Sequence, residues 1–220
     1  MCKNQIINYC TTRYPFKDLF EKLFECKIED LHFKYDIEDT VHWDAEKYPN
    51  AGLDLVYDKI YPFPFQSLYD DFLKNVVKAE IAQRSPSVRV VCSDRKLIYG
   101  PTTNGLNTHR DGEAPYSHPV WETNYWVPFI DTDEYNCLII ENEMFKLKYG
   151  EMLIFNGNTK KHGTFVHNKS KNTRISMDFR CCKFSDYDTS LLSNVKIKSR
   201  GKWFLQNEYF TTEKYYKIVS

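Results

Sequence analysis

Residues 174–180 read Arg-Ile-Ser-Met-Asp-Phe-Arg, a strict alternation of polar and apolar side chains. Successive side chains of an extended strand point to opposite faces, so this run predicts a half-buried strand. Its apolar face, Ile175, Met177 and Phe179, is expected to pack on a core. The polar face is then expected to look into one cavity, with Arg174, Ser176, Asp178 and Arg180.

The sequence from Val88 onward has a pattern typical of β-rich proteins, with short runs of β-branched and aromatic residues separated by Pro, Gly, Asn and Asp. Strands are expected at 88–92, 96–99, 123–129, 137–140, 152–155, 164–167 and 173–183. Helical patterns followed by many short strands favour a mainly β fold with flanking helices (α+β). The expected core is a double-stranded β-helix, which is a cupin-like jelly roll.

Two amphipathic helices are predicted before these strands. Within residues 15–27, apolar residues recur at helical spacing and Pro15 suits a first turn. After Pro62-Phe-Pro64, a second helical pattern runs to about Gln83. Both helices are expected to cover the outside of a sheet. The stretch 28–58 has no metal-type spacing, and we assign His32, His42 and Trp43 to core or edge packing.

The amino-acid composition limits the number of domains and the kinds of partner that this chain can have. With 220 residues, of which 42% are apolar, the chain can bury the core of a single domain. Thirty basic and thirty acidic residues cancel, which argues against a partner that is a nucleic acid or an anionic membrane. Seven cysteines without metal-type pairing indicate free thiols. Because no signal region or membrane-length apolar run is apparent, we expect a cytoplasmic protein with a small-molecule partner.

The expected organisation is one domain over residues 1–220. Residues 1–85 form a mostly helical buttress, 86–185 the jelly-roll core, and 186–220 a C-terminal extension. Lysine and arginine alternate with other residues from Lys196 to Lys202. This pattern favours a solvated edge strand over a phosphate-binding patch.

His109 and Asp111 are two residues apart, so on a strand their side chains face the same point. A third ligand is available further along the chain in His162. Two histidines and one carboxylate make the facial triad of non-haem Fe(II) oxygenases, which leaves three metal positions open. His167 is the competing third ligand. His118 precedes Pro119 and is expected to shape the neighbouring loop.

Arg174 follows His162 on the inward face of the predicted strand. A guanidinium in that position suits a bidentate contact with a carboxylate, and Ser176 can add a hydroxyl. A metal triad followed by such a carboxylate site implies a co-substrate with one carboxylate at the metal and a second one further in. That description fits 2-oxoglutarate.

The motifs occur in a fixed order along the chain: His109-Arg-Asp111-Gly, His118-Pro119, Asn124-Tyr-Trp126-Val-Pro128-Phe, Asn136-Cys-Leu138-Ile-Ile-Glu141, Tyr149-Gly150-Glu151, Phe155-Asn156-Gly157, His162-Gly163, Asn168 and Thr173 to Arg180. In this order the sequence resembles the Fe(II)/2-oxoglutarate-dependent dioxygenases. The most similar pattern is the streptomycin-biosynthesis StrG-type branch, near the phytanoyl-CoA dioxygenase group.

This resemblance implies iron ligands and catalytic residues at His109, Asp111 and His162. It also implies that Arg174 holds the distal carboxylate of 2-oxoglutarate, and it favours His162 over His167 because Gly163 follows His162. Ser176 and Asn124 are assigned to the co-substrate less firmly, and Asn124 is equally suited to a structural amide. The implied cofactors are Fe(II), 2-oxoglutarate and dioxygen.

The expected reaction is hydroxylation of a small metabolite or natural-product intermediate, with release of succinate and CO2. The carboxylate of Asp111 argues against halogenation, since related halogenases lack it, whereas desaturation and cyclisation would use the same ligands. A cupin-like sugar isomerase or epimerase and a non-catalytic binding barrel are the alternatives. Asp178 and Arg180 are also interpreted as a pair that only neutralises itself. The oligomeric state stays open.

Overall fold

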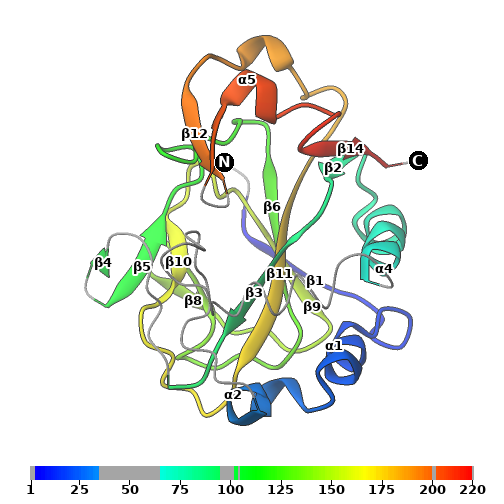
Figure 1. Ribbon diagram of the computed structural model, residues 1–220, viewed down its shortest axis with the longest axis vertical. Coiled ribbons are helices and arrows are strands. Elements are labelled where there is room, and N and C mark those ends of the chain that lie inside the picture. Colours follow the sequence, from blue (N-terminus) through cyan, green and yellow to red (C-terminus); the bar gives the residue numbers. More distant parts are fainter. Residues whose placement is uncertain (1–2, 35–64, 95–101, 104, 200–201, 220) are drawn as a thin grey trace.

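The computed structural model describes residues 3–34, 65–94, 102–103, 105–199 and 202–219. In this part the chain is mostly β with few helices (Figure 1). A seven-stranded antiparallel sheet has the order β1 (Gln5–Asn8), β9 (Glu151–Phe155), β6 (Thr123–Pro128), β11 (Arg174–Cys182), β2 (Ile81–Gln83) and β14 (Tyr216–Ile218), and β3 (Ser87–Val91) also pairs with β11.

A second, five-stranded sheet has the order β4 (Thr102–Thr103), β5 (Leu106–His109), β10 (His162–Phe165), β7 (Leu138–Ile140) and β8 (Glu143–Phe145). An apolar cluster joins the two sheets: Trp126, Leu153 and Phe155 come from the larger sheet, and Leu138, Ile140 and Phe145 from the smaller one. Two antiparallel sheets therefore pack face to face, and a cavity lined by residues of both sheets lies between them.

Strand β11 confirms the predicted alternation. Ile175, Met177 and Phe179 are fully buried in the main core cluster beside the helices. Arg174, Asp178 and Arg180 instead line a cavity together with His162 of the smaller sheet. Three of the four polar residues thus line a cavity on the side of the second sheet, whereas Ser176 is not among its lining residues.

Helices cover the outer face of the seven-stranded sheet. The helix α1 (Phe16–Phe24) buries Phe16 and Phe20 against Phe129, with ring centroids 5.2 and 5.0 Å apart. Pro15 is the N-cap residue rather than part of the first turn. Short turns of 3-10 helix (Ile28–Asp30) and α2 (Leu31–Lys34) follow, and α4 (Phe65–Phe72) adds further rings to the same core cluster.

The second helix is shorter than predicted. It continues from α4 only through a π-helical turn (Leu73–Val77) and ends at Lys78, which has a left-handed φ of 55°. The expected extension to Gln83 is wrong because Ile81–Gln83 form β2 and pair with β11 and β14. Burial between two strands outweighs the local helical pattern here.

Other boundaries differ as well. Strands β1 and β14 have no counterpart among the predictions, and β10 begins at His162 instead of Thr164. The tail forms its own hairpin of β12 (Lys196–Ser199) and β13 (Lys202–Leu205), with Ile197 buried, and is therefore not an edge strand of a main sheet. It is flanked by a 3-10 turn (Thr189–Leu191) and by α5 (Gln206–Tyr209). The predicted strand 96–99, His42 and Trp43 lie outside the described residues.

The described residues also bear on the state of the cysteines and on membrane-spanning helices. Every cysteine among them is a free thiol, as predicted. None of the described helices combines the length and the apolar character that a membrane crossing requires.

The pairing of β5 with β10 brings two histidines of the cavity wall together. In its register His162 is opposite His109, and Gly163 is opposite Thr108. A Cβ atom on Gly163 would stand 1.8 Å from the carbonyl oxygen of Asn107, so only glycine lets the two backbones approach this closely.

We therefore expect Gly163→Ala to push β10 away from β5. Overpacking of this kind costs about 1–3 kcal/mol of unfolding free energy, which chemical denaturation measures. Thr164→Ala, on the next residue of β10, is the matched control and should cost less than Gly163→Ala. Equal stability of the Gly163→Ala protein and the unsubstituted protein would contradict this packing.

Candidate metal centre

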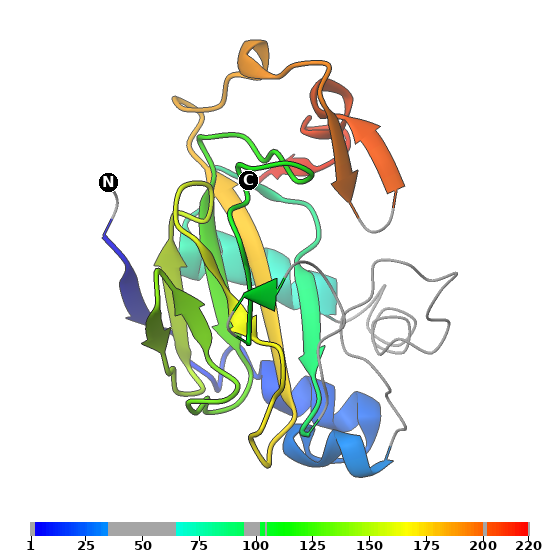
Figure 2. The same ribbon diagram turned by 90° about the vertical axis from the view of Figure 1, so that its left-hand side faces the viewer.

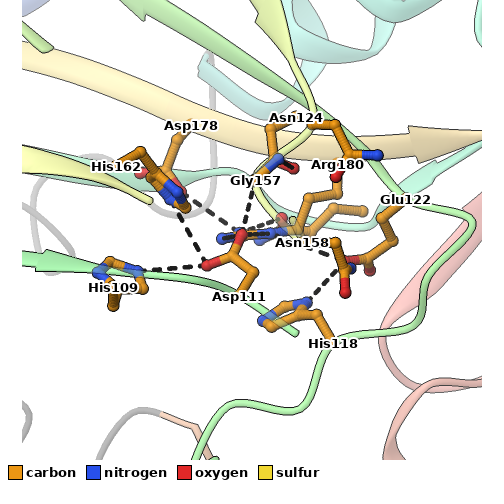
Figure 3. Close-up of polar contacts among 12 residues, drawn as sticks. His109, Asp111, His118, Glu122, Asn124, Gly157, Asn158, His162, Asp178 and Arg180 are labelled. Carbon is orange, nitrogen blue, oxygen red and sulfur yellow. Dashed lines mark hydrogen bonds and ion pairs between the residues drawn. The ribbon is translucent and has the colours of Figure 1, made fainter. Parts of the chain in front are cut away.

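His109, Asp111 and His162 converge at one point between the two sheets. His109 ends β5, Asp111 follows it in the next turn, and His162 begins β10. The Nε2 atoms of His109 and His162 lie 3.2 and 3.7 Å from Oδ1 of Asp111. One donor atom from each residue lies within 4.8 Å of the others, and this is the only such group among the described residues. Figure 3 shows the three side chains around a common point.

These donors fit a metal ion. Ligands about 2.1 Å from a metal and on adjacent octahedral positions lie about 3 Å apart, close to the observed separations. Two imidazoles and a carboxylate are also the donor set of the facial triad. The site can thus hold a divalent cation with three positions left for other ligands.

The second oxygen of Asp111 is held by the protein. Oδ2 accepts hydrogen bonds from Nε and Nη2 of Arg180, at 3.1 and 2.7 Å, and from Nδ2 of Asn124 at 2.7 Å. Figure 3 shows these two residues on the far side of the carboxylate from the histidines. Oδ1 is left facing the histidines, so the geometry favours a single metal bond from this residue.

The electrostatics keep both buried ligands in the state that binds a metal. Burial raises the pKa of Asp111, but the charge of Arg180, the neighbouring His162 and the hydrogen bond with His109 hold it well below its usual value. Burial lowers the pKa of His162 to about 4, against the opposing effect of Asp111. At neutral pH Asp111 is therefore ionised and His162 is neutral.

The two imidazoles are oriented differently. Nδ1 of His162 lies 3.0 Å from the carbonyl oxygen of Lys160, and because a carbonyl only accepts, Nδ1 carries the proton and Nε2 is free for a metal. Nδ1 of His109 is buried and has no hydrogen-bond partner in the described part of the chain. The ring of His109 instead contacts that of Tyr116, with centroids 4.9 Å apart.

Arg174 shares a cavity with the triad. This cavity of about 50 Å³ is lined by His109, His162 and Arg174, with Asn124 and Trp126 also on its wall. Arg174 is 1% exposed, its guanidinium carbon lies 5.5 Å from the Trp126 ring centroid, and Nη1 donates to the carbonyl of Asn136. A buried cation thus lies in the cavity that adjoins the candidate ligands.

Ser176 and Asn124, the other two predicted co-substrate residues, lie in different settings. The Ser176 hydroxyl is fully buried and has no hydrogen-bond partner within the described ranges. Asn124 lines the Arg174 cavity, yet both ends of its amide are used, since Oδ1 accepts from the Gly157 backbone at 2.9 Å while Nδ2 donates to Asp111. Asn124 therefore acts at least as a structural amide that links β6 to the Asp111 carboxylate.

The two remaining histidines near the site have other partners. Nδ1 of His118 lies 2.7 Å from Oε2 of the buried Glu122, and its backbone N–H donates to the Asp111 carbonyl at 2.8 Å. This matches the expected role of shaping the loop. His167 is partly exposed and contacts Oδ1 of Asp94 at 2.9 Å, away from the triad.

The interpretation of Asp178 and Arg180 as a self-contained pair needs correction. Their contact is 3.4 Å, whereas Asp178 is 2.6 Å from Arg89 and Arg180 is 2.7 Å from Asp111. The shorter contacts decide the pairing because charge-assisted hydrogen bonds weaken with distance. Strict alternation already placed Arg180 on the cavity face, but its partner Asp111 is distant in sequence and gave no local signal.

The chain is 30% identical over 213 residues to the streptomycin biosynthesis protein StrG of Streptomyces griseus. The alignment spans 96% of this chain and all of StrG. The chain belongs to the StrG family. No protein-family model matches this StrG-family chain.

Solved structures are only distantly similar to this StrG-family chain. The non-heme alpha ketoglutarate dependent carbocyclase SnoK from nogalamycin biosynthesis aligns with a TM-score of 0.45 and 14% identity, over 82% of this chain and 79% of SnoK. A 2OG-Fe(II) oxygenase family oxidoreductase from Burkholderia pseudomallei aligns with a TM-score of 0.34 and 13% identity, over 59% of this chain and 57% of that protein. Similarity at this level carries no inference.

The triad generates a direct test. We expect His109→Ala, Asp111→Ala and His162→Ala each to weaken Fe(II) binding by more than about 100-fold, because loss of an outer partner alone costs 10–100-fold. Anaerobic equilibrium dialysis measures this affinity. His167→Ala is the matched control and should bind iron normally. Iron loss in His167→Ala with retention in His162→Ala would move the third ligand to His167.

A second test concerns the residue that holds Asp111. Arg180→Lys keeps the charge but loses the two donors that meet Oδ2, so Fe(II) affinity should fall by about 10–100-fold. Arg110→Lys is the control, since Arg110 is part-exposed and pairs with Glu113. If the two variants bound iron equally, Arg180 would have no role in orienting the carboxylate.

Proposed function

We propose that this chain is an Fe(II)- and 2-oxoglutarate-dependent oxygenase that hydroxylates a small metabolite or natural-product intermediate and releases succinate and CO2. One observation supports the proposal: the buried Arg174 lines the same space between the sheets as His109 and His162, two of the three residues of the candidate metal centre. The cofactors are Fe(II), 2-oxoglutarate and dioxygen.

The position of Arg174 supports the co-substrate. Its guanidinium is almost fully buried, with the Trp126 ring on one side. Removed from water, a planar fork of donors favours a planar anion, and a carboxylate satisfies two donors at once. The Ser176 hydroxyl, two residues along the same face of β11 and without a partner in the described chain, is suited to the same anion.

In the proposed reaction the metal and co-substrates supply the oxidation, and the side chains of the protein bind and orient them. When bound, iron with 2-oxoglutarate and dioxygen supplies the oxidising power to break a substrate C–H bond. His109, Asp111 and His162 hold the metal, and Arg180 and Asn124 fix the direction of the Asp111 carboxylate. Arg174 orients the co-substrate, and the apolar side chains of Trp126, Leu138 and Phe155 limit the access of water to it.

The finer structural assignments belong to the same proposal. The two facing antiparallel sheets support a double-stranded β-helix, or jelly-roll, core within a single domain of residues 1–220. We also propose that the chain is related to the phytanoyl-CoA dioxygenase group, and the order of its motifs supports this relationship. The free thiols support a cytoplasmic location. The name of the relative StrG refers to streptomycin biosynthesis, which supports a natural-product intermediate as the substrate class.

A cupin-like isomerase or epimerase is the alternative reaction class. It could use the same barrel and metal ligands, but it has no need of a buried carboxylate-binding arginine beside the metal. Arg174 therefore separates the two classes.

Arg174→Lys should raise the apparent 2-oxoglutarate requirement by about tenfold or more, since charge-assisted hydrogen bonds contribute about 1.5–3 kcal/mol each. Arg174→Ala should raise it further because a buried carboxylate is left without a partner. Anaerobic titration of 2-oxoglutarate against the iron charge-transfer absorbance measures this, with Arg110→Ala as the control. Iron affinity should change little, and an unchanged titration in both Arg174 variants would remove the co-substrate assignment.

A further inference from the structure

A second cavity adjoins the metal centre on another side. It has a volume of about 180 Å³, and its wall includes His109, Asp111 and Arg180. His109 and Arg180 also line the Arg174 cavity, so the candidate metal position lies between the two spaces. The larger cavity is the one with room for a substrate.

The C-terminal segment forms part of the wall of this cavity. Ser199, Tyr209, Lys214 and Tyr215 contribute to its wall. Figure 2 shows this segment, coloured orange to red, at one end of the molecule beyond the strands of the main sheet. Residues distant in sequence from the triad therefore complete the space beside it.

Specific contacts fix the segment in place. The Arg84 backbone N–H donates to the Tyr215 carbonyl at 2.8 Å, and its Nη2 donates to the Thr212 and Tyr216 carbonyls at 2.7 and 3.0 Å. Near the triad, the Lys198 N–H donates to the Pro115 carbonyl at 2.8 Å. The segment is thus tied both to the main sheet and to the loop that follows Asp111.

The charges on this wall do not cancel. Asp111 pairs with Arg180, and Asp178 pairs with Arg89 at 2.6 Å. Arg84 and Lys214 also line the cavity, and neither makes an ion pair with any carboxylate that the structure describes. Glu213, next to Lys214 in sequence, is exposed and accepts a hydrogen bond from Thr212 at 3.1 Å. Both cations are solvent-exposed, and Arg84 also interacts electrostatically with Glu213. Both therefore remain accessible to an anionic ligand.

The ammonium group of Lys214 lies over two aromatic rings beside the cavity. Its Nζ lies 4.7 Å from the centroid of Phe204 and 5.8 Å from that of Tyr209. These contacts position the ammonium without neutralising it, since a ring face carries no net charge. Hydroxyl groups of Ser85, Ser87, Ser199 and Tyr209 also line the wall. Those of Ser199 and Tyr209 are hydrogen-bonded to each other at 2.7 Å, and each hydroxyl oxygen can still accept a further hydrogen bond.

We propose that this cavity, whose wall includes residues of the C-terminal segment, is the substrate site and selects a hydroxylated small molecule that carries an oxyanion, either a phosphate or a carboxylate, which Lys214 and Arg84 bind. The assignment rests on the proposed function for the identity of the neighbouring metal centre. The two accessible cations and the hydroxyl groups of the wall define the ligand class.

Three hydroxylated probes test whether the cavity prefers an anionic ligand: glucose, which is neutral, and glucose 6-phosphate and gluconate, which carry a phosphate and a carboxylate. Their dissociation constants are measured by calorimetry on the full chain, both alone and with Fe(II) and 2-oxoglutarate under anaerobic conditions. At least one anionic probe should bind about tenfold more tightly than glucose, and the stronger one tells phosphate from carboxylate. Lys214→Met should weaken that probe about three- to tenfold, and Lys214→Arg should restore it.

Lys196→Met is the control, because Lys196 is an exposed lysine of the same C-terminal segment outside the cavity. Equal binding of all three probes, or an anion preference that is as large in Lys214→Met as in the unsubstituted chain, would overturn the substrate assignment. A chain that prefers the anionic probe but fails to bind 2-oxoglutarate would instead overturn the proposed function and leave the anion site in place.

Discussion

The charge on the buried Asp111 carboxylate is the constraint on which the site depends. Asp111 is 2% exposed, and an unpaired buried carboxylate would cost several kcal/mol or become protonated. Arg180 of β11 and Asn124 of β6 prevent both outcomes by donating to one oxygen. The other oxygen is left with the two histidines, so the interactions that stabilise the fold also leave one oxygen of the ligand available to a metal.

Sheet geometry brings the remaining groups to this carboxylate. Close approach of β10 to β5 at Gly163 sets His162 opposite His109, and alternation along β11 sends Arg174 and Arg180 to the same face. The two arginines differ in partner: Arg180 pairs with a carboxylate of the protein, whereas Arg174 lies in the cavity that we assign to a carboxylate of the co-substrate. Two adjoining cavities then give the two proposed ligands separate places beside one metal position.

Much of this arrangement could be predicted from local sequence patterns. Helix α1 and the alternation of β11 follow from periodicity, and the spacing of His109 and Asp111 predicts that both side chains face the same point. The choice of His162 over His167 as the third ligand depends on the resemblance to the Fe(II)/2-oxoglutarate-dependent dioxygenases. The end of the second helix could not be predicted, because Ile81–Gln83 join a sheet through partners about a hundred residues away, at Cys181 and Cys182. Similarly, nothing near Arg180 in sequence points to Asp111, and nothing in the tail indicates that Lys214 lines a cavity with His109. Such long-range contacts have no local signature.

We propose above all that Fe(II) held by this triad lets the chain consume 2-oxoglutarate. Release of CO2 from C1 of labelled 2-oxoglutarate, measured with and without Fe(II) and dioxygen, tests it most directly. We expect slow release even without substrate, an absolute requirement for both Fe(II) and dioxygen, and loss of release in Asp111→Ala. A chain that binds Fe(II) at the triad but never releases CO2, whichever metabolites are added, would contradict the account and favour an isomerase or a binding protein.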